Sequence, residues 1–314
     1  MKQFLIIFIT CIFVLAVFIG RCNDDTTIDE ERTEFVQAEK IDNTTKEKNE
    51  KGSESEEYHK KRINKDSAFV IPKEPNDVSS QVLVRKAYTT SYNRNTRCPN
   101  WVAWELTREH TYGPFSRDGV PYYADDGTVY GIGSVSAETI KNCYIMDLES
   151  EEPRQQLMDW STKFNMSHGH MCPAGDNKWD KSAMNQTFLL TNMCPQDEKL
   201  NNGGWRALEE KCRSWARLYG EIYIVAGPIY NGIPKRYLGQ IAIPDAFFKV
   251  ILCIHNKPKA IGFVYQNDSF SQSFRETHCT VDSVESITGF DFFGQLEDSI
   301  EDGIESHSNL NDWK

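Results

Sequence analysis

The feature that most limits what this chain can fold into is a polar tract at residues 23–80. The tract is rich in Glu, Lys, Asn, Thr and Ser and has few apolar side chains. Such a segment cannot bury enough apolar surface to offset the entropy that it would lose on ordering. We therefore expect a disordered acidic and polar linker at residues 23–80. The folded domain is expected at residues 81–314, which are enough to bury a sizeable core.

The segment before this tract is apolar. Lys2 provides a positive start, and residues 4–19 are almost wholly apolar. A stretch of this length is short for a membrane span and suits the core of a signal peptide. We expect a signal peptide at residues 1–22, with a membrane anchor as the alternative. The protein would then be secreted or held in the periplasm or cell envelope, or be tethered to a membrane with its domain outside the cytoplasm.

The charge of the chain is unevenly spread. The net charge of −11 is unusual for a protein that binds nucleic acid, where a basic surface is the rule. Residues 161–220, however, hold eight Lys or Arg against six Asp or Glu. The average charge therefore does not exclude a basic surface in the middle of the chain.

The cysteines allow disulfides but do not indicate a common zinc motif. The chain has nine, of which seven lie in the expected domain, so at least one of these is a free thiol. Export permits disulfide formation. No C-x-x-C pair occurs. We expect Cys253 and Cys279 to pair, because they lie on successive strand-like segments that would bring their Cα atoms close enough.

Strand-like segments, rich in aromatic and β-branched residues, lie on both sides of a helical segment. These strand-like segments are at residues 101–106, 220–230, 241–255 and 259–267. The helical segment is at residues 201–220, with the helix itself predicted from about Gly204 to Tyr219 and ended by Gly220. Its apolar residues form one stripe: Trp205, Leu208, Cys212, Trp215 and Leu218. Near the C-terminus, residues 283–293 indicate a turn and residues 296–306 a short acidic helix.

Reactive side chains gather in "SHGHMCPAGDNKW", residues 167–179. On a strand, His168, His170 and Cys172 would share one face and offer three zinc ligands. A second interpretation makes Cys172 a nucleophile. A third makes Cys172 and Cys194 small buried apolar side chains. The residues of this stretch alone leave all three interpretations open.

The chain downstream adds residues that follow the order of a known family. They are Gly169-His170, Pro173-Ala174, Asn192, Pro195-Gln196, Leu200-Asn201, Trp205 and Leu208-Glu209. This series closely resembles the DNA/RNA non-specific endonucleases, the ββα-metal nucleases that include endonuclease G. The resemblance covers roughly residues 85–305. It implies an α+β fold with a mainly antiparallel central sheet flanked by helices. It also implies a ββα-metal active-site element, in which a strand pair carries His170 and a helix carries Glu209.

The resemblance further implies a metal-dependent enzyme that hydrolyses phosphodiester bonds of DNA and RNA without sequence specificity. Asn201 is then the direct ligand of Mg²⁺, with Mn²⁺ as the alternative ion, and Glu209 holds the metal's waters. Oxygen ligands of this kind suit Mg²⁺ better than zinc. His170 is the general base that takes a proton from the attacking water. The expected products carry a 5′-phosphate and a 3′-hydroxyl.

Two further residues match family positions around the reaction centre. Asn192 matches an asparagine that orients active-site groups, and its alternative is a plain turn residue. Arg213 matches a position that holds the phosphate. It follows Glu209 by four residues on the same helix face, so a solvated partner of Glu209 is its alternative. We expect Trp205 and Trp215 in the core rather than as platforms for bases.

One position departs from the family. The family has Asp-Arg before Gly-His, and its arginine contacts the scissile phosphate, whereas this chain has Ser167-His168. Histidine lacks the permanent charge and the forked geometry of arginine. We expect a protonated His168 to make the phosphate contact, with Arg117 as the alternative source of charge. The departure favours an alternative function, a catalytically weakened nucleic-acid-binding relative. The expected partners are DNA and RNA, and the sequence indicates no protein partner.

Overall fold

The computed structural model describes residues 70–117, 144–160, 166–255 and 257–314, together with the backbone of three short strands between residues 122 and 139. The expected signal peptide at residues 1–22 and most of the expected linker lie outside the described residues, as does Cys143. Within the described ranges, no helix has both the length and the apolar character needed to cross a membrane.

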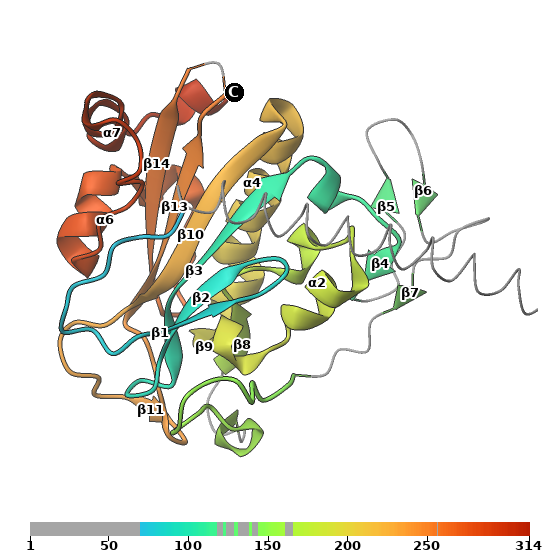
Figure 1. Cartoon of the computed structure of the whole chain (residues 1–314), viewed down its shortest axis with the longest axis vertical. Coiled ribbons are helices and arrows are strands. Elements are labelled where there is room, and N and C mark those ends of the chain that lie inside the picture. Colours follow the sequence, from blue (N-terminus) through green and yellow to red (C-terminus); the bar gives the residue numbers. More distant parts are fainter. Residues whose placement is uncertain are drawn as a thin grey trace, which may run out of the picture. The chain divides into compact units, whose positions relative to one another are not determined.

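A seven-stranded sheet forms the centre of the fold (Figure 1). Its order is β1-β2-β3-β10-β13-β14-β15, and each neighbouring pair is antiparallel. The strands are β1 (Gln81–Val84), β2 (Thr89–Asn93), β3 (Cys98–Thr107), β10 (Glu221–Ile229), β13 (Ala246–Cys253), β14 (Lys259–Gln266) and β15 (His278–Cys279). This architecture confirms the predicted α+β fold with a mainly antiparallel sheet.

The side chains of the central strands alternate between two apolar cores. On β10, Ile222 and Ile224 pack into one core, and Tyr223 and Val225 pack into the other. A strand that is buried on both faces needs an almost continuous apolar run, and β10, buried from its second residue to its last, has one. The sheet is therefore the middle of three layers.

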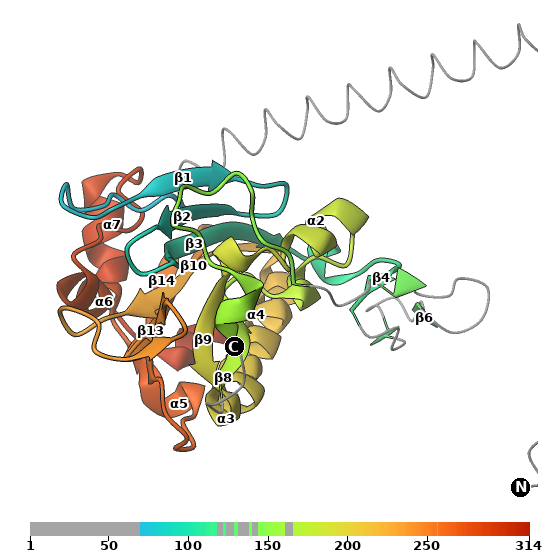
Figure 2. The same ribbon diagram turned by 90° about the horizontal axis from the view of Figure 1, so that it is seen from below.

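Helices cover both faces of the sheet (Figures 1 and 2). One face carries α4 (Arg206–Tyr219) together with the strand pair β8 (Met166–His170) and β9 (Met193–Asp197). The opposite face carries α6 (Val281–Thr288) and α7 (Asp298–Glu305). The remaining short elements are β4 (Phe115–Ser116), β5 (Tyr122–Tyr123), β6 (Val129–Tyr130), β7 (Glu138–Thr139), α2 (Lys181–Gln186), α3 (Glu198–Leu200), β11 (Tyr237–Leu238), β12 (Ile241–Ala242) and α5 (Phe274–Thr277).

The predicted helix is present, but its apolar stripe is shorter than expected. Trp205 and Trp215 are buried in the core, as predicted, whereas Leu218 is 56% exposed. Each step of three residues turns a helix by about 300°, so two such steps after Cys212 rotate Leu218 out of the stripe. The stripe therefore ends at Trp215 and Ala216.

Two element predictions were wrong in detail. Residues 283–293 do not form only a turn: α6 runs to Thr288, and Gly289 ends it in a left-handed conformation (φ 74°). The folded domain also begins before residue 81. Val70 is 2% exposed, and the backbones of Lys73 and Asp291 exchange hydrogen bonds of 2.8 and 3.1 Å. The short apolar stretch at the end of the polar tract thus has a place in the core.

The predicted Cys253–Cys279 disulfide is absent, because both cysteines are free thiols. β14 lies between their two strands: Cys253 pairs with Lys259, and Cys279 pairs with Gly262. Two strand spacings are roughly 9–10 Å, which is beyond the reach of a disulfide. The two cysteines therefore lie on strands that are separated by β14, not on neighbouring strands.

Candidate active site

A strand pair followed by a helix is present, as predicted. The pair is β8 and β9, the helix is α4, and all three lie on the same face of the sheet. In the antiparallel pair, His170 at the end of β8 lies opposite Met193 on β9. Gly169 permits this pairing, because a Cβ atom there would lie 2.6 Å from the Cβ of Gln196. After β9 the chain enters α4, which carries Glu209. The Gly-His step of the sequence therefore reflects the close approach of two strands.

The entry to α4 is distorted, and the regular helix begins at Arg206, close to the predicted start near residue 204. Residues Asn201–Trp205 form a π-helical turn, and Gly203 has non-helical angles (φ −105°, ψ −108°). At Gly204 a Cβ atom would lie 2.1 Å from the carbonyl oxygen of Gln272, so only glycine fits. π-helical turns recur at functional sites because they redirect side chains. Here the turn changes the angle between Asn201 and Glu209.

A cavity of about 390 Å³ lies beside the end of β8 and the first turns of α4. Its lining includes four cationic side chains and two acidic ones, so it is locally positive although the chain carries a net charge of −11. The lining residues are Ser116, Arg117, His170, Pro173, Ala174, Gly175, Lys178, Met184, Asn201, Asn202, Arg206, Glu209, Glu210 and Arg213. The cavity thus brings together five of the predicted site residues and leaves out Asn192 and His168.

His170 lines the cavity as a neutral imidazole. It is 7% exposed, and among the described residues its Nε2 atom has no hydrogen-bond partner. Burial lowers its pKa to about 3, and the positive charge of Arg117 contributes in the same direction. A neutral ring with a free nitrogen can accept a proton. The arrangement is suited to general-base chemistry in this cavity.

Asn192 holds the backbone that follows His170. Its Oδ1 accepts a hydrogen bond from the backbone N–H of Cys172, and its Nδ2 donates to the backbone oxygens of Cys172 and Thr187, all at 2.8–2.9 Å. Asn192 is completely buried and does not reach the cavity. Its side chain fixes the turn after β8, so Asn192 acts on the site through His170.

Asn201 and Glu209 have the chemistry to hold a hard divalent cation. Both line the cavity, and neither side chain forms a hydrogen bond or ion pair with another described residue. Their amide and carboxylate oxygens are the ligand types that Mg²⁺ takes. Burial raises the pKa of Glu209 to about 7, while nearby Lys249 and Arg213 lower it. A cation here would favour the ionised carboxylate further.

Arg213 lines the cavity but is paired with Asp176, not with Glu209. Its Nη1 lies 2.9 Å from Asp176 Oδ1, and the Nε1 of Trp104 donates to Oδ2 of the same carboxylate at 3.1 Å. Gly175 leaves room for this pair, because a Cβ atom there would lie 2.9 Å from Nη1. The guanidinium is thereby held in one orientation at the cavity wall.

Sequence reasoning missed two lysines near the site. Lys178 lines the cavity, and burial lowers its pKa to about 8. Lys249, on β13, is completely buried, and its Nζ has no hydrogen-bond partner among the described residues. The Lys249 ammonium lies 4.2 Å from the ring centre of Trp205, where a cation–π attraction offsets part of its desolvation. Lys178 follows the matched Pro173-Ala174 closely in sequence, but nothing in the sequence marks Lys249.

His168 does not take the position that was expected of it. Its ring is stacked between Tyr144, at 3.8 Å, and Trp160, at 3.7 Å, and it is not part of the cavity lining. Desolvation lowers its pKa to about 4, so the ring is neutral near pH 7. Both its place and its neutral form speak against the expected contact of a protonated His168 with the phosphate. Arg117, the alternative source of charge, does line the cavity.

The zinc and cysteine-nucleophile interpretations also fail. Within the described ranges, the one group of three metal-ligating side chains lies elsewhere, and it includes neither His170 nor Cys172. Cys172 is completely buried, and burial raises its pKa well above the ordinary value for a thiol. A buried neutral thiol is a poor nucleophile. Cys172 and Cys194 are both in the apolar core.

The fold and the site together define an α+β protein with a strand-pair-and-helix element at a positive cavity. Residues 65–299 match the model of the DNA/RNA non-specific endonuclease family, and the chain belongs to that family. Nuclease C1 of Cunninghamella echinulata is 30% identical over 232 residues, which cover 68% of this chain and 83% of that protein.

Two further similarities agree with this assignment. The human mitochondrial nuclease EXOG is 25% identical over 228 residues, which cover 67% of this chain. The matched region spans only 56% of the length of the human protein. A chain in the crystal structure of the EndoG/EndoGI complex superposes with a TM-score of 0.57 at 24% identity, covering 75% of this chain and 93% of that one. The likeness to this structure concerns the fold.

Proposed function

We propose that this chain is a divalent-metal-dependent endonuclease that hydrolyses phosphodiester bonds of DNA and RNA without sequence specificity. One observation carries the proposal. His170, whose buried Nε2 has no hydrogen-bond partner among the described residues, lines the same positive cavity as Asn201 and Glu209. A base, a set of oxygen ligands and cations around one cavity are the groups that phosphodiester hydrolysis requires.

In this proposal His170 is the general base. Its Nε2 takes a proton from the water that attacks phosphorus in line with the leaving 3′ oxygen. Burial keeps the ring neutral at ordinary pH, and a neutral imidazole with an unpartnered nitrogen is the form that can accept a proton. Asn192 sets the position of the ring through the backbone of Cys172. The products carry a 5′-phosphate and a 3′-hydroxyl.

Asn201 and Glu209 would hold the cation, for which we propose Mg²⁺. When bound, such an ion stabilises the negative charge that develops on the phosphate and on the leaving oxygen. Arg117, Lys178 and Arg213 bind the phosphate backbone. Contacts of this kind carry no sequence information, so they agree with non-specific cleavage.

Export remains part of the proposal. The apolar residues 4–19 after Lys2 support a signal peptide, with a membrane tether as the alternative. The domain would then work outside the cytoplasm. Nucleic acid is the proposed partner.

Digestion of plasmid DNA and of RNA tests the function. The purified protein should cut both with Mg²⁺ and neither with EDTA, and His170→Ala should lose about 10²- to 10⁴-fold in rate while remaining folded. The second candidate is a weakened nucleic-acid-binding relative, favoured by His168 in place of the family's arginine. Binding of DNA without cleavage at any Mg²⁺ concentration would establish that candidate instead.

A further inference from the structure

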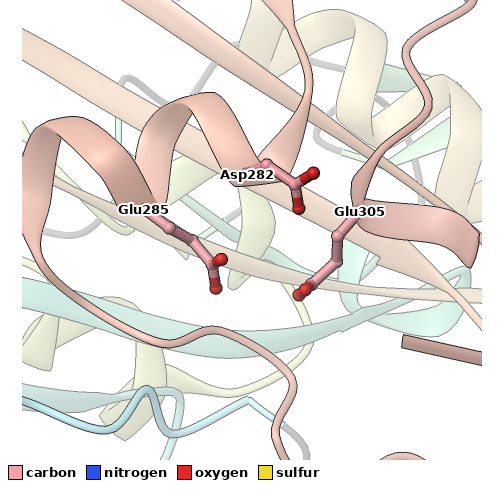
Figure 3. A group of neighbouring side chains, drawn as sticks. All are labelled: Asp282, Glu285 and Glu305. Carbon is pink, nitrogen blue, oxygen red and sulfur yellow. The ribbon is translucent and has the colours of Figure 1, made fainter. Parts of the chain in front are cut away.

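Three carboxylates converge on the face of the sheet opposite the active site. Asp282 and Glu285 lie one turn apart on α6, and Glu305 is the last residue of α7 (Figure 3). One oxygen from each carboxylate lies within 4.8 Å of the other two. Because α6 and α7 pack on the side of the sheet away from α4, this cluster is separate from the cavity that contains His170 (Figure 1).

Glu305 is the unusual member of this cluster. It is 5% exposed, and its Oε1 atom is buried without a hydrogen-bond partner among the described residues. Figure 3 shows its carboxylate turned to the side on which that of Glu285 lies, and an oxygen of Asp282 is within the same 4.8 Å. Glu305 also ends its helix, where the helix dipole disfavours an anion. A buried carboxylate with an unpaired oxygen is costly, so this position calls for a partner.

The surroundings of Glu305 supply further negative charge. Burial and the carboxylates of Glu285, Glu301, Asp282 and Asp291 raise its pKa to about 9. Burial is also the main cause of a raised pKa at Glu285. Among the described residues, no Lys or Arg lies within 4.0 Å of the three clustered carboxylates. The cluster therefore combines close spacing with an uncompensated negative field.

We propose that Asp282, Glu285 and Glu305 form a binding site for a divalent cation, Ca²⁺. Calcium binds oxygens at 2.3–2.6 Å, so oxygens around one ion are at most about 5 Å apart, which agrees with the observed spacing. Mg²⁺ prefers one or two carboxylates and several waters, whereas three convergent carboxylates suit Ca²⁺.

Each of the two helices has a carboxylate oxygen available to a cation: Glu305 Oε1 on α7 and one oxygen of Glu285 on α6. Glu285 Oε1 accepts a hydrogen bond of 2.8 Å from the backbone N–H of Phe292, which fixes the side chain and leaves its second oxygen for the ion. Asp282 is exposed and gives the ion a route from solvent. A bound ion would join α6 to the end of α7 and hold both against β14, so it would stabilise the fold without touching the active site.

A shared proton is the competing explanation for the buried Glu305. A neutral carboxyl could lie beside Glu285 without any cation. The two explanations differ for Glu305→Gln, which has the shape of the neutral acid. If a proton is shared, this variant is as stable as its parent and neither protein responds to Ca²⁺. If a cation is bound, the variant loses the response.

The test measures the thermal unfolding midpoint, Tm, of the full chain after EDTA treatment and during titration with CaCl₂ or MgCl₂. All proteins carry Asn201→Ala, which removes the direct ligand proposed for the active-site metal. Saturation with Ca²⁺ to 100 times its dissociation constant should raise Tm by roughly 5–10 °C. Mg²⁺ should act only at much higher concentration.

Added to this background, Glu305→Gln should abolish the Ca²⁺-dependent rise. Asp302→Asn is the matched control, because it removes the same charge from an exposed position on the same helix and should preserve the rise. Asp282→Asn, also at an exposed position, repeats the test without altering a buried side chain. The proposal is overturned if Ca²⁺ does not raise Tm, or if the rise survives both Glu305→Gln and Asp282→Asn.

Discussion

Asp176 and Arg213 form an ion pair of 2.9 Å, and the carboxylate of Asp176 is only 1% exposed. The pair joins the Ala174–Asp176 turn to α4, so it links the two parts of the chain that line the cavity. Its geometry places one edge of the guanidinium against Asp176. The orientation of Arg213 in the cavity therefore depends on a residue that does not itself line the cavity.

We expect Asp176→Asn to weaken substrate binding and to destabilise the protein. The change leaves a largely buried Arg213 without its counter-charge, which costs roughly 3–5 kcal/mol of unfolding free energy. Denaturant unfolding measures the stability, and a rise in KM measures the loss of phosphate contact. The exposed pair Arg206–Glu210 is the control for stability, and Glu210→Gln should cost under about 0.5 kcal/mol. Equal stability losses in both variants would contradict this account.

Arg117, rather than His168, should provide the phosphate charge that the family takes from its arginine. Arg117→Ala should raise KM and reduce the slope of log affinity against log salt by about one unit. His168→Phe keeps a ring between Tyr144 and Trp160 and should leave that slope unchanged. The measurement is binding of a DNA oligonucleotide between 50 and 200 mM salt, over about a fourfold range. A reduced slope in His168→Phe alone would reverse the assignment.

The assignment of Asn201 as a direct metal ligand predicts rescue by metal. Asn201→Ala removes an amide oxygen, and the Mg²⁺ concentration that gives half-maximal activity should rise by roughly 10- to 100-fold. Added Mg²⁺ should then restore part of the rate. Asn201→Asp is the matched variant, since it retains an oxygen ligand and should need less added metal than the alanine variant. A lower rate with an unchanged metal requirement would indicate a purely structural role.

The positive charge of Lys249 should stabilise the ionised form of Glu209 and so lower its pKa. Burial raises the pKa of Glu209 to about 7, and Lys249 is the largest opposing influence. In Lys249→Met this pKa rises further, so kcat/KM should fall at pH 7 and recover toward pH 9. Structural damage alone would lower the rate equally at both pH values. The profile of Arg206→Met, which removes an exposed cation at the cavity, is the comparison.

The sequence predicted the fold, and it predicted that His170, Asn201 and Glu209 would lie close together, which they do around one cavity. Strands buried on both faces need apolar runs, and these stand out in β10 and β13. His170, Asn201 and Glu209 follow one another along a single strand-and-helix element. Their separation along the chain therefore largely determines how far apart they lie in the folded protein.

The rest of the site depends on long-range packing. Lys249 lies in a run that reads as an ordinary strand, and only the register of the sheet shows that it faces Trp205. His168 was placed at the phosphate because it is next to the Gly-His step, but Tyr144 and Trp160 come from a separate segment and enclose its ring. No local pattern in the sequence reveals such neighbours.

The buried His170 and the half-buried His168 of β8 should make the protein sensitive to acid. The folded-state pKa values, about 4 for His168 and about 3 for His170, lie below the ordinary value of 6.5. Between pH 6.5 and these lower folded-state values, the unfolded chain binds more protons than the folded one. The free energy of unfolding therefore falls as pH drops below about 6.5.

His168→Phe isolates one of these two contributions. It keeps the stacked ring and cannot be protonated, so it should lose less stability than the wild type between pH 7.5 and pH 4.5, by roughly 1–3 kcal/mol. Urea unfolding at the two pH values measures the difference. At pH 7.5 both histidines are neutral in the folded and the unfolded chain, so any difference there reports packing alone. An equal acid-induced loss in the two proteins would show that the ring of His168 is reached by solvent and titrates normally.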